Sequence, residues 1–278
     1  MTRTAVATAA LAVACAVAVG CGATVDGVPV VGVTPTAATM AAPAAAAAAA
    51  ANRWMDVTGQ GVEAPRDNVD GAQYGPVPLP GTKVLHLLNS SGDMDFCTLG
   101  PAIRSVDGNR AGFLTAGHCG IGGYAAEQFL QTTADGETEL LGIATAAEDD
   151  DRGIDSAAIW VPGGVDPRAS SIAGFPVHRV MSAPEVRSSL PAGSPVCLNG
   201  ALAGVACGQL LDPDDDRRIR FSAITDEGDS GAPVFVVDRV TKRATVIGIL
   251  EGGNALTTTA TYAEPALARL GAVLATAP

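Results

Sequence analysis

The residues best suited to chemistry in this sequence surround Ser230, in the stretch Asp-Glu-Gly-Asp-Ser-Gly at residues 226–231. A serine hydroxyl is a weak nucleophile and needs a neighbouring base that removes its proton. Attack on a carbonyl group also requires N–H donors that stabilise the resulting oxyanion. Gly228 can supply such a donor from a tight turn in which a side chain would interfere. Taken alone, the same residues could equally form an ordinary surface turn.

Two other stretches contain the partners that a nucleophilic serine requires. Thr-Ala-Gly-His-Cys at residues 115–119 supplies a base, His118, and Asp-Ser-Ala-Ala-Ile at residues 155–159 supplies an acid, Asp155, that can orient the base. The chain order His, Asp, Ser is that of the chymotrypsin-type triad and differs from the order in subtilisin and in α/β-hydrolases. Asp155 begins an apolar run, where burial of a carboxylate without a partner is unfavourable. A partner such as His118 would offset that penalty.

The three blocks together resemble the trypsin/chymotrypsin-like serine protease family, especially its bacterial branch, over about residues 84–271. The resemblance implies an all-β fold of two six-stranded antiparallel β-barrels with a short C-terminal helix. It implies a serine endopeptidase that forms an acyl-enzyme intermediate, with Ser230 as nucleophile and His118 as general base and then general acid. Asp155 would fix the imidazole tautomer. The N–H groups of Gly228 and Ser230 would form the oxyanion hole.

The same resemblance implies where the specificity pocket lies. Its floor corresponds to Ile224, which is followed by Thr225, and its opposite wall corresponds to Gly252 and Gly253. No acid stands at the floor, so cleavage after Lys or Arg is not favoured. Two glycines leave the pocket open, which favours apolar or small substrate side chains.

Three positions depart from the family pattern. Glu251 stands where the family usually has a serine that hydrogen-bonds the catalytic Asp, and a second carboxylate near Asp155 would raise a pKa. Leu198 stands where bacterial relatives place an arginine that neutralises the acid matching Asp229, and Ala232 replaces a glycine. The arginines that could take over the neutralising role are Arg152, Arg218 and Arg220.

Two alternative functions remain beside the endopeptidase. The first is a catalytically weak or inactive binding module with a protease fold, tethered to the cell envelope, which Glu251 and Leu198 motivate. The second is an esterase of the Gly-Asp-Ser type. Those esterases place the serine before the Asp and His, and a G-x-S-x-G elbow would need a glycine where Ala232 stands.

Short β-prone runs separated by glycine-rich turns predict the elements that position these residues. Strand candidates lie at residues 84–88, 111–115, 139–145, 156–161, 195–198, 217–224, 234–240, 244–250 and 257–262. Two barrels need about 180–200 residues, which is what residues 81–278 provide. Leucines at helical spacing after Pro265 predict a closing helix within residues 263–275. We interpret His86 as a barrel residue and His178 as a surface loop residue.

The cysteines divide by position. Cys15 lies in an apolar leader and Cys21 ends it, whereas Cys97, Cys119, Cys197 and Cys207 lie in the expected domain. An even number in a chain with a leader suggests two disulfides, for which four cysteines allow three pairings. The family resemblance implies the pairs Cys97–Cys119 and Cys197–Cys207.

The N-terminal residues have the composition of a leader followed by a tether. Residues 1–20 combine a charged start, an apolar run and small residues, which is typical of a secretory signal peptide. The residues before Cys21 resemble a bacterial lipobox, so Cys21 is the expected lipidation site. Residues 21–80 are rich in Ala, Pro, Thr and Gly, and we expect a low-complexity tether with Trp54 unplaced.

Charge and composition limit the expected partners. A formal net charge of −12 argues against binding to a nucleic-acid backbone. The acidic runs at residues 148–151 and 212–216 are expected to be solvated loops, since neither has the EF-hand spacing of a calcium site. We expect a monomer that needs no metal or cofactor and acts on protein or peptide substrates. It would act outside the cytoplasm, either secreted or held on the outer face of the cell membrane by a lipid on Cys21.

Overall fold

A computed structural model describes residues 53–121, 127–133, 136–150, 153–213, 215, 217–254 and 256–278. The expected signal peptide and Cys21 lie outside these ranges. The chain divides into the units Met1–Thr39 and Met40–Pro278, and the elements below all belong to the second. None of its described helices has the length and hydropathy needed to cross a membrane.

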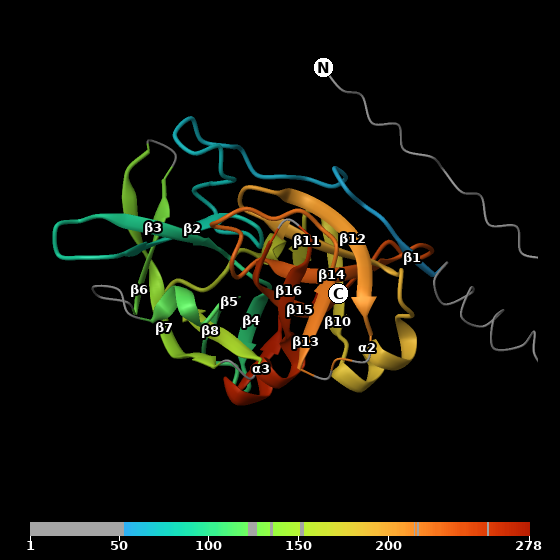
Figure 1. The fold of residues 1–278 in the computed structure, drawn as a ribbon. Coiled ribbons are helices and arrows are strands. Elements are labelled where there is room, and N and C mark those ends of the chain that lie inside the picture. The colour runs from blue at the N-terminus through green and yellow to red at the C-terminus, as the bar shows by residue number, and fades with distance from the viewer. Residues whose placement is uncertain are drawn as a thin grey trace, which may run out of the picture. The chain divides into compact units, whose positions relative to one another are not determined.

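The first sheet contains eight strands in the order β17-β4-β5-β8-β7-β6-β2-β3, and every pairing in it is antiparallel. Figure 1 shows the strands from β2 to β8 in teal to yellow-green. Among the described residues the end strands β17 and β3 do not pair, so this sheet is curled but open. The strands are β2 (Lys83–Leu87), β3 (Met94–Thr98), β4 (Ala102–Ser105), β5 (Ala111–Thr115), β6 (Gln128–Thr132), β7 (Thr138–Asp150), β8 (Ile154–Trp160) and β17 (Ala272–Leu274).

The second sheet contains nine strands in the order β1-β14-β11-β12-β13-β16-β15-β10-β9. An additional pairing of β14 with β15 closes the six strands from β14 to β15 into a barrel. Only the pairing of β10 with β15 is parallel among the described strands. The strands are β1 (Trp54–Met55), β9 (Ser171–Ile172), β10 (Phe175–Val180), β11 (Pro195–Gly200), β12 (Gly204–Asp212), β13 (Arg218–Phe221), β14 (Pro233–Asp238), β15 (Ala244–Gly253) and β16 (Thr258–Tyr262).

The expected all-β, chymotrypsin-like fold of two barrels is confirmed, with the refinement that hydrogen bonds close only the second barrel among the described residues. Apolar side chains fill both, and one buried cluster joins them because it contains Leu114 and Trp160 from the first sheet and Phe235 and Ile249 from the second. Burial of each such side chain contributes about 1.5–3 kcal/mol.

Two helices accompany the strands, α2 (Ala183–Ser189) and α3 (Ala263–Arg269). A capping box between Ser182 and Glu185 starts α2, which the sequence analysis did not anticipate. The helix expected within residues 263–275 ends earlier than that range, because Gly271 adopts a φ of 59° directly after the last turn. The chain then forms β17, so a strand rather than a helix closes the fold.

One further expectation was wrong, and a second was confirmed only in part. Residues 148–150 are not a loop but the end of β7, where Asp149 lies opposite Asp155 in the ladder. Within the run 212–216, Asp212 ends β12, while Asp215 accepts hydrogen bonds from Arg220 at 2.6 Å and from the N–H groups of Arg217 and Arg218. Local partners therefore order the described part of this run.

The expected tether also differs from the structure, because residues 53–80 pack on the second barrel. Trp54 is 1% exposed and lies in β1, which pairs with β14. Gln73 is equally buried and donates to Asn199 and to the Gly200 carbonyl, at 3.1 and 2.8 Å. Lys83 forms ion pairs with Asp67 and Asp70. Most residues of this segment are small, so its composition did not indicate that its few large side chains would hold it against the folded domain.

Candidate active site

Three predicted site residues come from three separate elements. His118 begins the 3₁₀ helix η1 (His118–Gly120), which follows β5. Asp155 lies near the start of β8, which pairs with β5, and Ser230 lies in the turn that leads into β14. The first two residues therefore belong to the open sheet and the third to the closed barrel.

His118 and Asp155 are in direct contact through both carboxylate oxygens. The imidazole Nδ1 lies 2.8 Å from Asp155 Oδ2, and the backbone N–H of His118 donates to Oδ1 at 2.9 Å. The Asp155 side chain is 1% exposed, whereas the His118 side chain is 38% exposed. The buried acid thus fixes an imidazole whose other face remains accessible.

Gly117 permits this arrangement by its lack of a side chain. A Cβ at this position would overlap the carbonyl of Glu148 and approach the N–H of Ser156 to 2.8 Å. The turn that carries His118 can therefore press against β7 and β8, the two strands that surround Asp155. Its φ of −67° is ordinary, so the requirement here is space and not backbone conformation.

The turn around Ser230 also depends on a glycine. Gly228 has a φ of 103°, a conformation that L side chains rarely adopt, and a Cβ there would overlap the ring of Phe96. Its carbonyl accepts from the Thr98 hydroxyl at 2.8 Å, and the Ser230 carbonyl accepts from the Thr98 N–H at 2.7 Å. Among the described residues, no protein acceptor binds the N–H groups of Gly228 and Ser230. Both donors are therefore available to a ligand.

The Ser230 hydroxyl points to the backbone of β15. Its Oγ lies 3.4 Å from the carbonyl oxygen of Glu251, a long hydrogen bond. Within the described part of the chain it forms no hydrogen bond with His118. Catalytic hydrogen bonds in enzymes without substrate are often long or misaligned and shorten when substrate binds.

Asp229 is fully buried and is held by backbone groups. Its Oδ1 accepts from the N–H groups of Leu202 and Ala203 at 2.8 and 3.1 Å, and its Oδ2 accepts from Asp226 N–H at 2.9 Å. Burial raises the pKa of Asp229, and these three hydrogen bonds oppose that shift.

None of the arginines suggested from the sequence neutralises Asp229 among the described residues. Arg218 pairs with Glu251 at 2.9 Å, and Arg220 pairs with Asp215 at 2.6 Å. Arg152 lies outside the described residues.

One carboxylate oxygen of Glu251 forms an ion pair, and the other is buried. Its Oε1 binds Arg218, whereas its Oε2 is buried without a hydrogen-bond partner among the described residues. Burial is the main cause that raises the pKa of Glu251, the nearby Asp155 and Asp149 raise it further, and Arg218 opposes them. The departure from the family pattern at this position thus places a second carboxyl group close to the acid of the candidate triad.

His118 is surrounded by negative charge. The hydrogen bond that the imidazole donates to Asp155 is the largest cause that raises the pKa of His118, burial opposes it, and the charges of Asp155, Asp149 and Glu251 add to the rise. A base with a raised pKa is a stronger proton acceptor but is neutral only at higher pH.

Two groups of residues have donor atoms close enough for a metal ion. One comprises His118, Asp149 and Asp155, whose candidate ligand atoms lie within 4.8 Å of one another. However, His118 Nδ1 is already bound to Asp155. The other comprises His118 with Cys97 and Cys119, but a metal needs thiolates and both sulfurs are in a disulfide.

Only some of the predicted pocket residues lie near one another. A Cβ on Gly253 would approach Thr225 Oγ1 to 2.8 Å, so these two residues are neighbours, and Gly252 faces open space. Ile224 is 79% exposed and does not form a buried floor. The sequence offset from Ser230 was therefore a weak guide to this side chain.

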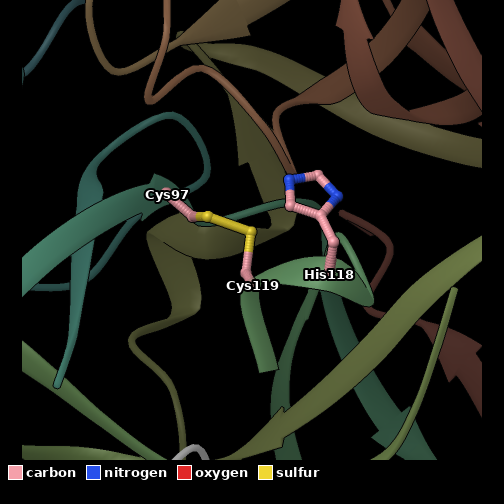
Figure 2. Close-up of side chains that lie close together, drawn as sticks. All are labelled: Cys97, His118 and Cys119. Carbon is pink, nitrogen blue, oxygen red and sulfur yellow. A yellow bond between two sulfur atoms is a disulfide. The ribbon is translucent and has the colours of Figure 1, made fainter. Parts of the chain in front are cut away.

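Both disulfides have the pairing that the resemblance implied. Cys97–Cys119 links β3 to η1, and Figure 2 shows it next to the imidazole of His118. Cys197–Cys207 joins opposite residues of β11 and β12. The first disulfide therefore fixes the residue that follows the candidate base.

The other two predicted histidines lie on strands. His86 lies in β2, where its Nδ1 is buried without a described partner and its ring centroid lies 6.1 Å from that of Phe129. His178 is exposed, as expected for a surface residue, but lies in β10 and not in a loop.

No protein-family model matches the chain, and no curated protein matches its sequence. Solved structures do match. A glutamic acid-specific serine protease, described as using a histidine triad in substrate binding, is 18% identical with a TM-score of 0.51, over 71% of this chain and 100% of its own. Thermobifida fusca Protease A is 21% identical with a TM-score of 0.49, over 73% and 100%. Cellulomonas bogoriensis chymotrypsin is 22% identical with a TM-score of 0.43, over 73% and 100%.

These identities are too low to transfer an activity, but the agreement in fold is independent of sequence. The first of the three structures aligns with this chain over its whole length, with a TM-score of 0.51. Together with the closed barrel, the curled sheet and the order of their strands, it shows that the described chain has the fold of the bacterial chymotrypsin-like serine proteases.

Proposed function

We propose that this protein is a serine endopeptidase. The observation that carries the proposal is the bond between the His118 imidazole and the buried Asp155 carboxylate, 2.8 Å long. Gly231, next to Ser230, packs against Thr115 and Ala116 just before His118. A buried acid that binds Nδ1 leaves Nε2 as the proton acceptor and stabilises the imidazolium that forms.

In the proposed reaction, Ser230 Oγ attacks the carbonyl carbon of a peptide bond while His118 Nε2 takes the hydroxyl proton. The N–H groups of Gly228 and Ser230 bind the oxyanion. The C–N bond breaks as His118 returns the proton to the leaving amine, which leaves an acyl-enzyme. Water, deprotonated by His118, then attacks the ester carbonyl carbon. The bond from this carbon to Ser230 Oγ breaks, and His118 returns the proton to Oγ.

The hydroxyl of Ser230 must turn away from the Glu251 carbonyl before it can reach His118. Rotation about one side-chain bond is a change that exposed side chains make on the picosecond to nanosecond timescale. The substrate would occupy the space on the accessible side of the imidazole.

Labelling with a fluorophosphonate tests the proposal, because this probe reacts with activated serines. We expect the full chain to be labelled and Ser230→Ala to be unlabelled. Ser188→Ala is the matched control, since Ser188 is an exposed serine of α2, distant in sequence from the candidate triad, and should leave labelling unchanged. If the wild-type chain were folded but not labelled, a binding module would be the better description.

For specificity, we propose that Thr225, Gly252 and Gly253 border the pocket and favour apolar or small side chains before the cleaved bond. The open space at Gly252 and the absence of an acid among these residues support it. Cleavage of a mixed peptide library, read by mass spectrometry, tests the preference. Predominant cleavage after Lys or Arg would contradict it.

For location, we propose that the protein acts outside the cytoplasm, anchored through a lipid on Cys21. Two disulfides support an oxidising compartment. In cell fractions, Cys21→Ser should move the protein from the membrane to the soluble fraction, while Cys15→Ser should leave it on the membrane. Recovery of the wild-type chain in the soluble fraction alone would contradict the anchor.

A further inference from the structure

Arg66 lies on the far side of the peptide groups that hold Asp229. Its Nη1 donates to the carbonyl of Leu202 at 2.8 Å and to the carbonyl of Ala201 at 3.4 Å. The Leu202 carbonyl shares a peptide group with the N–H of Ala203, and the Ala201 carbonyl shares one with the N–H of Leu202. Those two N–H groups are the donors to Asp229 Oδ1.

A peptide group placed between a cation and an anion is polarised by both. A guanidinium at the carbonyl oxygen withdraws electron density and strengthens the N–H as a donor, because hydrogen bonds in a chain reinforce one another. Each peptide dipole here has its oxygen at Arg66 and its N–H at Asp229. The positive charge of Arg66 thus acts on a carboxylate that it does not touch.

The segment that carries Arg66 is fixed on both sides of the turn between β11 and β12. Glu63 accepts from the Val205 N–H at 3.1 Å and from Arg66 Nη2 at 3.2 Å. The Gln73 N–H donates to the Ala201 carbonyl at 2.7 Å, and Arg66 Nη1 also donates to the Gly71 carbonyl at 2.9 Å. Arg66 is therefore held in place by its own segment and not by chance contact of a mobile side chain.

We propose that Arg66 is a positioning residue, which acts through the peptide groups 201–202 and 202–203 to keep the Asp229 carboxylate ionised and in place beside Ser230. The inference rests on the proposed function of Ser230. It assigns to the N-terminal segment the neutralising role that the sequence suggested for Arg152, Arg218 or Arg220.

The position of Asp229 matters because it lies between the two proposed oxyanion donors. Gly228 and Ser230 flank it directly, and a carboxylate that shifts must move their N–H groups as well. The groups of like charge that face this region are Asp226, which raises the pKa of Asp229, and Glu63, which is bound to Arg66. Loss of Arg66 would leave Glu63 without this cationic partner.

The test compares Arg66→Ala, Arg66→Lys and the control Arg168→Ala, an exposed arginine paired with Asp166, in the full chain. We expect Arg66→Ala to lower the rate of Ser230 labelling about 10- to 100-fold, mainly in kcat for a peptide substrate and not in KM. Arg66→Lys should lose less, because a lysine keeps the charge. Arg66 is 37% exposed, so millimolar guanidinium should restore part of the rate in Arg66→Ala.

A second measurement does not depend on activity. The carboxyl carbon signal of Asp229, assigned in NMR spectra with Asp229→Asn, reports its titration directly. We expect Arg66→Ala to move this titration to higher pH and Arg168→Ala to leave it unchanged. A destabilised Arg66→Ala can be recorded at a lower temperature, at which it is folded.

Each outcome decides between the two claims. The role of Arg66 would be overturned if the Asp229 titration were unchanged in Arg66→Ala, or if this variant lost labelling only in proportion to its unfolded fraction. Labelling of Ser230 in the wild type would still support the proposed function. If the Asp229 titration shifts in Arg66→Ala but the wild-type chain is never labelled, the role of Arg66 is supported and the endopeptidase is refuted.

Discussion

The candidate site contains two buried aspartates, and the two sheets hold them in different ways. Asp155, on β8 of the open sheet, binds the imidazole of His118 with one carboxylate oxygen and the backbone N–H of the same residue with the other. Asp229, beside Ser230 in the closed barrel, binds backbone N–H groups in the turn between β11 and β12 and at Asp226. An imidazole can gain and lose a proton, whereas an amide cannot. The first acid is therefore suited to assist proton transfer, and the second to fix a backbone conformation.

Asp155→Asn should have the largest effect on activity, because it removes the carboxylate that assists proton transfer. An amide in place of the carboxylate favours the wrong imidazole tautomer, and in the serine protease template this change lowers kcat about 10⁴-fold. Hydrolysis of a peptide substrate measures it. Asp166→Asn, at the cap of η2 (Pro167–Ser170), is the control. A loss below tenfold would mean that Asp155 does not orient the base.

Gly200→Ala should disturb the other acid. A Cβ at residue 200 would overlap Asp229 Oδ1, and the change should lower the free energy of unfolding by about 1–3 kcal/mol. We expect Ser230 labelling of the folded variant to fall about 100-fold, because small displacements at a site have effects of that size. Gly163→Ala meets no atom within 4 Å and should change neither quantity. Normal labelling of Gly200→Ala would separate Asp229 from the site.

The two disulfides allow a matched comparison, because one lies in each region. Replacement of either cysteine pair by alanine should lower the free energy of unfolding by about 2–4 kcal/mol. Cys97–Cys119 spans 22 residues and Cys197–Cys207 spans 10, so loss of the former should be more destabilising, by about 0.7 kcal/mol. Denaturant titrations measure both.

The activity of the two disulfide variants sharpens the same comparison. Loss of Cys97–Cys119 should also slow labelling in the folded protein, because Cys119 follows His118 directly in η1. Loss of Cys197–Cys207 should leave the labelling rate of the folded protein closer to that of the wild type. The reverse order in the labelling rates would contradict the assignment of the base to the first sheet.

Glu251→Gln should have the smallest effect. The charge of Glu251 contributes to the raised pKa of His118, so its removal should lower that pKa. His118 must be neutral to act as a base, and the acid limb of the pH–rate profile should therefore move to lower pH, by less than about one unit. Glu264→Gln, at the start of α3, is the control. A shift to higher pH would contradict the stated sign.

Features with clear sequence signals were predicted well. The contact between His118 and Asp155 and the two disulfide pairs that the family resemblance implied are present, and β5 has the predicted bounds. The catalytic roles of His118, Asp155 and Ser230 stay predictions. The strand β3 was not among the predicted strands, since its first residues, Met94 and Asp95, are exposed on a hairpin and carry no apolar alternation.

The arrangement around Asp229 could not be predicted in the same way. Its partners are backbone amides of Leu202 and Ala203, and amides have no residue signature. Arg66 reaches them from residues that composition assigned to a tether, 136 positions before Leu202. Which donors meet a buried acid depends on tertiary packing, and side chains of matching charge are only one solution.

The two ends of the described chain complete opposite sheets. Trp54 and Met55 form β1 next to β14, the strand that follows Ser230, while Ala272–Leu274 form β17 at the edge of the sheet whose strand β5 precedes His118. Pairings between residues so distant in sequence form slowly. The sheet beside Ser230 is therefore whole only once β1 has paired with β14, and the sheet beside His118 only once β17 has paired with β4, so assembly of the candidate site depends on slow, long-range contacts.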